Sequence, residues 1–232
     1  MNLLAAPPRS SRSTGPARSA APAPGRQPMP QRRVSVTVAF LFLVQMITAM
    51  LGTSLIQAFE DGDTARGPLA VGVLLMVCSG LAVVGIGLLM YQVLKAVDRR
   101  LALCYPVLRV AELTVSTVCG AFLLTQLQVV PNHLLWVYIP TGLGGLVMTY
   151  LLIVSRVVPR PIAVLGLVGY TALSVGVPLD LLGVVDMGEG RGLLLLAPGG
   201  LFEFVVLPLW LIAKGFRSPS SGNDPAVRTT AP

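Results

Sequence analysis

The stretch PLAVGVLLMVCSGLAVVGIGLLMYQVL, residues 68–94, contains no Asp, Glu, Lys, Arg or His and decides the fold class. A helix that crosses the hydrocarbon core of a bilayer needs about 20 predominantly apolar residues. This stretch exceeds that length, so we predict a membrane-spanning helix here.

The same pattern recurs along most of the chain. Residues 34–58 are uncharged, and the long run 113–155 is interrupted only by Pro131, Asn132 and His133. The chain is 54% hydrophobic and 12% charged, whereas a soluble domain carries about 25% charged residues. We predict an all-α polytopic membrane protein, a bundle of six transmembrane helices at residues 34–59, 68–97, 101–129, 134–155, 161–185 and 192–215.

Two tails flank the predicted transmembrane domain, which occupies residues 34–216. Residues 1–33 are rich in Pro, Ala, Ser and Arg and contain no acidic residue. Such a composition cannot bury enough apolar surface to fold alone, so we expect a disordered basic tail. We expect the same of residues 217–232.

The distribution of basic residues predicts the orientation of the bundle. Cytoplasmic loops of membrane proteins are enriched in Lys and Arg. Only Arg66 and Arg191 fall on one side of the six predicted spans, in acidic loops. Fourteen basic residues fall on the other side: Arg9, Arg12, Arg18, Arg26, Arg32, Arg33, Lys95, Arg99, Arg100, Arg156, Arg160, Lys214, Arg217 and Arg228. We therefore expect a protein of the bacterial cytoplasmic (inner) membrane with both termini in the cytoplasm.

The net charge of +7 follows from this asymmetry and does not require a nucleic-acid partner. The lipid bilayer is the expected partner, and the basic N-terminal tail can contact anionic lipid headgroups. A protein partner and homo-oligomer formation both remain open from the sequence.

The sequence predicts neither a metal site nor a cofactor. Cys78, Cys104 and Cys119 lack metal-ligand or CxxC spacing, and we interpret them as small packing residues. The single histidine, His133, falls at a predicted turn, where we expect it to be solvated.

Four ionisable residues fall within the predicted spans: Arg109, Glu112, Asp180 and Glu203. Charges are costly in the membrane interior, so these residues are the candidate site. At 1.5 Å per helical residue, Glu203 lies roughly 17 Å from the boundary charges on either side, near the bilayer midplane. We predict that Glu203 faces protein, either protonated or paired with Arg109. Asp180 should approach the outer interface.

The depth of Arg109 and Glu112 depends on where the third span begins. If that span begins after Arg100, Glu112 lies about 18 Å deep. If Tyr105 and Pro106 mark the membrane entry, residues 99–104 form an interfacial turn and Arg109 extends to the headgroups. In both cases Arg109 and Glu112 share a helix face and can form an ion pair.

Proline and glycine interrupt two of the predicted spans. Residues 198–200 (Pro-Gly-Gly) precede Glu203, and residues 140–145 (Pro-Thr-Gly-Leu-Gly-Gly) lie inside the fourth span. Many transporters build midplane sites from broken helices. Glycine also permits close helix packing in membranes, and we favour that interpretation here.

Three segments carry a family resemblance. Residues 100–103 (Arg-Leu-Ala-Leu) and 108–112 (Leu-Arg-Val-Ala-Glu) form a basic entry followed by Arg-x-x-Glu. Residues 157–166 contain a Pro-Arg turn, and Glu203 is followed by residues 209–215 with a Trp and Lys-Gly. In this order the segments resemble the basic entry, the Pro-Arg hairpin and the final helix of an uncharacterised bacterial membrane family, the domain of unknown function 4386. The hairpin of this chain has an extra Ala-Val-Leu before the glycine.

The resemblance covers residues 34–216 and implies a six-helix bacterial membrane protein. It highlights Arg109, Glu112 and Glu203, and Asp180 falls where the family often carries an acidic or polar residue. It implies no activity.

Three function classes remain open. We favour a structural or regulatory membrane protein in which the buried charges hold helices together. A small-solute or proton-coupled ion transporter would use Arg109, Glu112 and Glu203 as a polar relay. A lipid-acting enzyme would need both carboxylates at one cavity. No nucleophile or metal motif supports that class, so we favour it least of the three.

Overall fold

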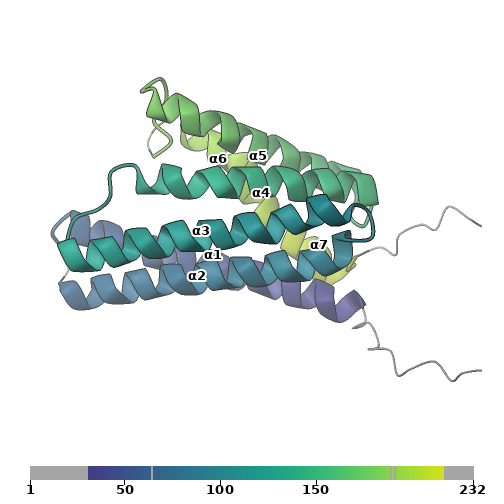
Figure 1. Ribbon diagram of the computed structural model, residues 1–232, viewed down its shortest axis with the longest axis horizontal. Coiled ribbons are helices and arrows are strands. Elements are labelled where there is room, and N and C mark those ends of the chain that lie inside the picture. Colours follow the sequence, from purple (N-terminus) through teal and green to yellow (C-terminus); the bar gives the residue numbers. More distant parts are fainter. Residues whose placement is uncertain (1–30, 64, 189, 191, 217–232) are drawn as a thin grey trace, which may run out of the picture.

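The computed structural model describes residues 31–63, 65–188, 190 and 192–216, and it is helical throughout its ordered elements (Figure 1). The expected disorder of the two tails concerns residues that lie almost entirely outside this part. The same is true of Arg191 and of most basic residues assigned to the tails.

Within the described residues, six helices are long and apolar enough to cross a membrane. Five are single elements, and the sixth is built from three consecutive pieces. They are α1 (Gln31–Glu60), α2 (Arg66–Leu94), α3 (Arg99–Gln126), α4 (His133–Ser155), α5 (Arg160–Leu181), and then α6 (Leu193–Gly200), η1 (Leu201–Val206) and α7 (Leu207–Ala213). We refer to α6, η1 and α7 together as the sixth span. The prediction of an all-α, six-span, multi-pass membrane protein is confirmed.

Helix α3 begins at Arg99, because Asp98 caps it. The Asp98 carboxylate accepts hydrogen bonds from the backbone N–H groups of Arg100 and Leu101 at 2.8 and 3.1 Å. Capping satisfies donors that the first helical turn cannot pair internally. The helix is continuous from Arg99, and Pro106 lies inside it. Residues 99–104 are therefore helical and do not form an irregular turn.

The proline and glycine run of the fourth span does not break its helix. Helix α4 is continuous, with Pro140 inside it. A side chain at Gly145 would overlap the ring of Tyr170 on α5, and one at Gly169 would overlap the backbone of Gly199 on α6. These close approaches support the packing interpretation of the glycines.

The sixth span crosses the bundle and closes it. Each helix from α1 to α5 packs against the helix that follows it in the sequence, so that α5 packs against α6. At the end of the chain, α7 packs against α1. Figure 1 shows α6 near α5 on one side of the molecule and α7 near α1 on the other. The first and last helices therefore meet at one end, which we call the tail end. The opposite end is the distal end.

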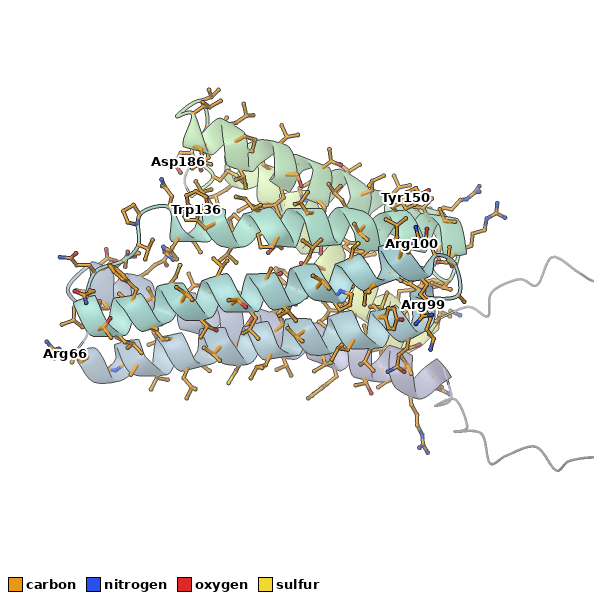
Figure 2. All side chains as sticks on the ribbon, viewed as in Figure 1. Arg66, Arg99, Arg100, Trp136, Tyr150 and Asp186 are labelled. Carbon is orange, nitrogen blue, oxygen red and sulfur yellow. The ribbon has the colours of Figure 1, made fainter. Side chains whose placement is uncertain are left out.

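The bundle has an apolar exterior and charged ends. Large apolar side chains such as Phe40, Leu74 and Val107 are exposed along the helices, as expected of a surface that contacts lipid. Figure 2 shows Arg99 and Arg100 at the tail end, and Arg66 and Asp186 at the distal end. Six apolar helices with this surface imply contact with a lipid bilayer.

Candidate functional site

Arg109 is the largest of the fully buried side chains, with 1% of its surface exposed. It lies ten residues after the start of α3 at Arg99, which places it about 15 Å along the helix. A side chain so enclosed by protein does not extend to the headgroups. The interpretation in which Arg109 reaches the membrane surface is therefore wrong.

Two carboxylates accompany Arg109, one from its own helix and one from the sixth span. Its Nη1 donates to Oε2 of Glu112 at 2.6 Å, one turn away on α3. Its Nη2 lies 3.7 Å from Oε1 of Glu203 on η1. The first contact is a short charge-assisted hydrogen bond, and the second is an ion pair without a direct hydrogen bond. The structure thus brings together three of the four predicted site residues.

Three further polar side chains complete what we call the central cluster: Gln45, Tyr105, Arg109, Glu112, Tyr170 and Glu203. The ring centroid of Tyr105 lies 5.1 Å from Cζ of Arg109, a cation–π distance. Gln45 on α1 and Tyr170 on α5 lie close enough to Glu203 to interact with it. The cluster therefore joins α1, α3, α5 and the sixth span.

Glu203 points inward because the sixth span changes its helical pitch there. Residues 201–206 form a π-helical turn in which the N–H of Leu207 bonds to the carbonyl of Phe202, five residues back. Pro208 follows, and its missing N–H leaves a carbonyl one turn earlier without its α-helical partner. The wider turn buries both Phe202 and Glu203. Such π-helical turns are frequent at functional sites.

Several polar atoms of the central cluster are buried without a hydrogen-bond partner of good geometry among the described residues. They are Oε1 of Gln45, the hydroxyls of Tyr105 and Tyr170, and Nε of Arg109. An unsatisfied buried polar group costs about 1–3 kcal/mol. The cluster also holds one guanidinium against two carboxylates, so it is not electrically balanced when both carboxylates are ionised.

Asp180, the fourth predicted site residue, belongs to a different part of the molecule. It lies in the last turn of α5 at the distal end, and its Oδ2 accepts a hydrogen bond from the N–H of Met187 at 2.7 Å. Asp180 thereby holds the α5–α6 loop. It is not a member of the central cluster.

Two adjoining cavities open at the distal end. The larger has a volume of about 580 Å³ and is lined by residues of α1, the α3–α4 loop, α4, the α5–α6 loop and α6, together with Asp180 at the end of α5. The narrower one, about 80 Å³, continues between α1, α2 and α3. A third, apolar cavity lies between α4 and α5. None of the three is lined by Arg109, Glu112 or Glu203.

Sequence reasoning missed Gln45, Tyr105 and Tyr170 as members of the central cluster. Gln45 offered a signal, because it is a polar amide in the middle of the uncharged run 34–58. The two tyrosines offered none, since tyrosine is ordinary in membrane helices. His133 begins α4 and lines both distal cavities, half-buried rather than fully solvated.

A family model described as Domain of unknown function (DUF4386) matches residues 121–215. The match covers the end of α3, helices α4 and α5, and the sixth span, and it confirms the resemblance over that part. Glu203 and Asp180 fall inside it, whereas Arg109 and Glu112 precede it. No curated protein and no solved structure matches the chain.

Proposed function

We propose that this multi-pass membrane protein is structural or regulatory, and that its central cluster is a clasp between α3 and the sixth span. The observation that carries the proposal is the position of Arg109 between Glu112 and Glu203. Helix α3 packs against α2 and α4, whereas the sixth span packs against α5 and α1. The Arg109 side chain therefore reaches across the interior and links helices that are not packing neighbours.

The expected contribution of the clasp follows from burial. Breaking a buried ion pair by removing one partner typically costs about 3–5 kcal/mol, because the other charge is left uncompensated. Removing Arg109 strands two carboxylates, whereas removing Glu203 leaves Arg109 bonded to Glu112. We therefore expect Arg109→Leu to be the more damaging change.

The test compares the thermal unfolding of detergent-purified variants. Arg109→Leu should lower the melting temperature most, by about 6–20 °C for a loss of 3–5 kcal/mol at about 2–4 °C per kcal/mol. Glu203→Leu should lower it less, and the triple variant Arg109→Leu/Glu112→Leu/Glu203→Leu should recover most of the loss. Asp61→Asn, a change at an exposed carboxylate at the distal end, is the control. If all variants match the wild type, the charges are not retained for folding and the clasp is rejected.

We further propose that the protein resides in the bacterial cytoplasmic membrane with both termini in the cytoplasm. Figure 2 shows Arg99 and Arg100 at the tail end. Arg156 and Arg160 belong to the α4–α5 connection, which lies at the same end in Figure 1. These basic residues support a cytoplasmic assignment for that end. A fluorescent protein fused after residue 232 should fold and emit. Alkaline phosphatase fused after residue 63 should be active, and the reverse pattern would invert the assignment.

A proton-coupled transporter is the second candidate, and one observation favours it. A single guanidinium faces two carboxylates, that of Glu203 buried and that of Glu112 half-buried. Beside them lie hydroxyl and amide oxygens that lack a hydrogen-bond partner of good geometry among the described residues. Transient protonation of one carboxylate would balance the charge. Proteoliposomes containing a pH-sensitive dye should then show proton uptake that Glu203→Gln abolishes. Equal uptake by wild type and variant would exclude this role for Glu203. Neither Glu112 nor Glu203 lines a described cavity, so no observation favours a lipid-acting enzyme.

A further inference from the structure

The two distal cavities adjoin along α1, the α3–α4 loop and α4. Seven residues line both: Thr53, Gln57, Glu60, Val129, Val130, His133 and Leu134. We call the combined space the distal chamber. It shares no residue with the central cluster, so a ligand can bind there whether or not the central cluster acts as a clasp.

The mouth of the distal chamber is acidic. Glu60 at the end of α1, Asp180 at the end of α5 and Asp186 in the α5–α6 loop all line the larger cavity. Figure 2 places Asp186 at the distal end of the molecule. Among the described lining residues there is no Lys or Arg to balance these carboxylates. A concave wall that carries one sign of charge attracts a ligand of the opposite sign.

The inner part of the chamber is apolar. Ile56 on α1, Val73 and Met76 on α2 and Leu123 on α3 line the narrow cavity between these helices. Its volume of about 80 Å³ suits a thin apolar group rather than a bulky ring system. The larger cavity, at about 580 Å³, is within the range of about 300–1,000 Å³ that is typical of small-molecule sites.

We propose that the distal chamber binds an amphiphilic organic cation, with its cationic head at Glu60 and Asp186 and its alkyl tail in the narrow cavity. Charge complementarity selects this occupant over an anionic lipid or a fatty acid, whose headgroups the three carboxylates repel. The apolar interior selects it over a small hydrated cation. Asp180 is half-buried and accepts the N–H of Met187, whereas Glu60 and Asp186 are exposed and can receive the head. Asp186 would do so through Oδ2, because its Oδ1 accepts the N–H of Gly188.

The test uses hexyltrimethylammonium as the probe and hexanesulfonate as its matched anion. Binding is measured by calorimetry on the full chain in nanodiscs of zwitterionic lipid, with empty nanodiscs subtracted. The cation should bind at least tenfold more tightly than the anion. Lengthening the alkyl chain from four to six carbons should tighten binding about fourfold per methylene until the narrow cavity is full.

Matched variants distinguish the effect of the carboxylates at the mouth of the chamber from the effect of general surface charge. Glu60→Gln/Asp186→Asn should weaken binding of the cation about tenfold. Asp61→Asn/Asp63→Asn removes the same charge from neighbouring residues that do not line the chamber, and should leave binding unchanged. Ser116→Leu, which fills the narrow cavity, should abolish the gain from the longer chain.

Three results would overturn the proposal. If the anion binds as tightly as the cation, the chamber does not select its ligand by charge. Equal weakening by the two double variants would reduce the effect to general surface charge. Unchanged binding by Glu60→Gln/Asp186→Asn, with its melting temperature at the wild-type value, would show that the mouth of the chamber does not receive the head.

Discussion

Replacing Gly166 with Ala tests the packing that holds the π-helical turn in place. A Cβ at this position on α5 would lie 2.7 Å from Cγ2 of Thr149 and 2.8 Å from two ring carbons of Phe202. Both neighbours are fully buried, so neither can swing away into open space. Ordinary contact begins near 3.4 Å, and α4 and η1 must therefore both move to admit one methyl group.

The magnitude follows from two opposing effects. Overpacking a well-filled core costs about 1–3 kcal/mol, and two immobile neighbours place this case at the upper end. Alanine is favoured over glycine inside a helix by about 0.5–1 kcal/mol. The net loss should be roughly 2 kcal/mol, or about 4–8 °C in melting temperature.

The assay is thermal unfolding in detergent, with Gly85→Ala as the matched control. A Cβ at Gly85, inside α2, would meet only Cδ1 of Leu41 at 3.3 Å, the end of a flexible side chain. This control should be neutral or slightly more stable than the wild type. In a Phe202→Leu background the ring is gone, so Gly166→Ala should cost clearly less. The same cost in both backgrounds, or equal stability of the Gly166 and Gly85 variants, would refute the reasoning.

Two other changes have expected outcomes that unfolding curves can check. Tyr105→Phe should be neutral or stabilising, because the hydroxyl has no partner of good geometry among the described residues. Tyr105→Leu should cost about 1–2 kcal/mol, because the ring contact with Arg109 is lost. Equal losses of stability in the two variants would contradict this reasoning. Asp98→Ala should cost about 0.5–2 kcal/mol, because the side chain that caps α3 is lost. Asp98→Asn should retain most of the wild-type stability. If Asp98→Ala is as stable as the wild type, the cap contributes nothing.

The spans could be predicted because insertion into a membrane depends on length and composition, which are local. The expected fourth span, 134–155, differs from α4 (His133–Ser155) by one residue. The expected second span, 68–97, extends three residues too far at its C-terminal end, because α2 ends at Leu94. The depth of a residue in the membrane also follows from its position within its own span. The cost of burying a charge at that depth therefore identified Arg109, Glu112 and Glu203 as candidate residues.

Contacts between helices could not be predicted in the same way, because hydropathy specifies the depth of a residue but not the direction it faces. Arg109 and Glu203 are now seen to pair, which the sequence left open against a protonated Glu203. Tyr105 and Tyr170 join the cluster through the rotation of α3 and α5, which depends on all the neighbouring helices. The π-helical turn also depends on tertiary packing, since Pro198 and Pro208 permit several hydrogen-bond patterns.

The order in which the chain is made has a consequence for Arg109. Arg109 precedes Glu203 by 94 residues, since 203 − 109 = 94. At about 5–20 residues per second of synthesis, the partner on the sixth span emerges roughly 5–20 s later. Throughout that interval Glu112, one turn away and made almost simultaneously, is the partner already present on the same helix. Helix α3 therefore carries a partner for Arg109 that does not depend on the sixth span having been made.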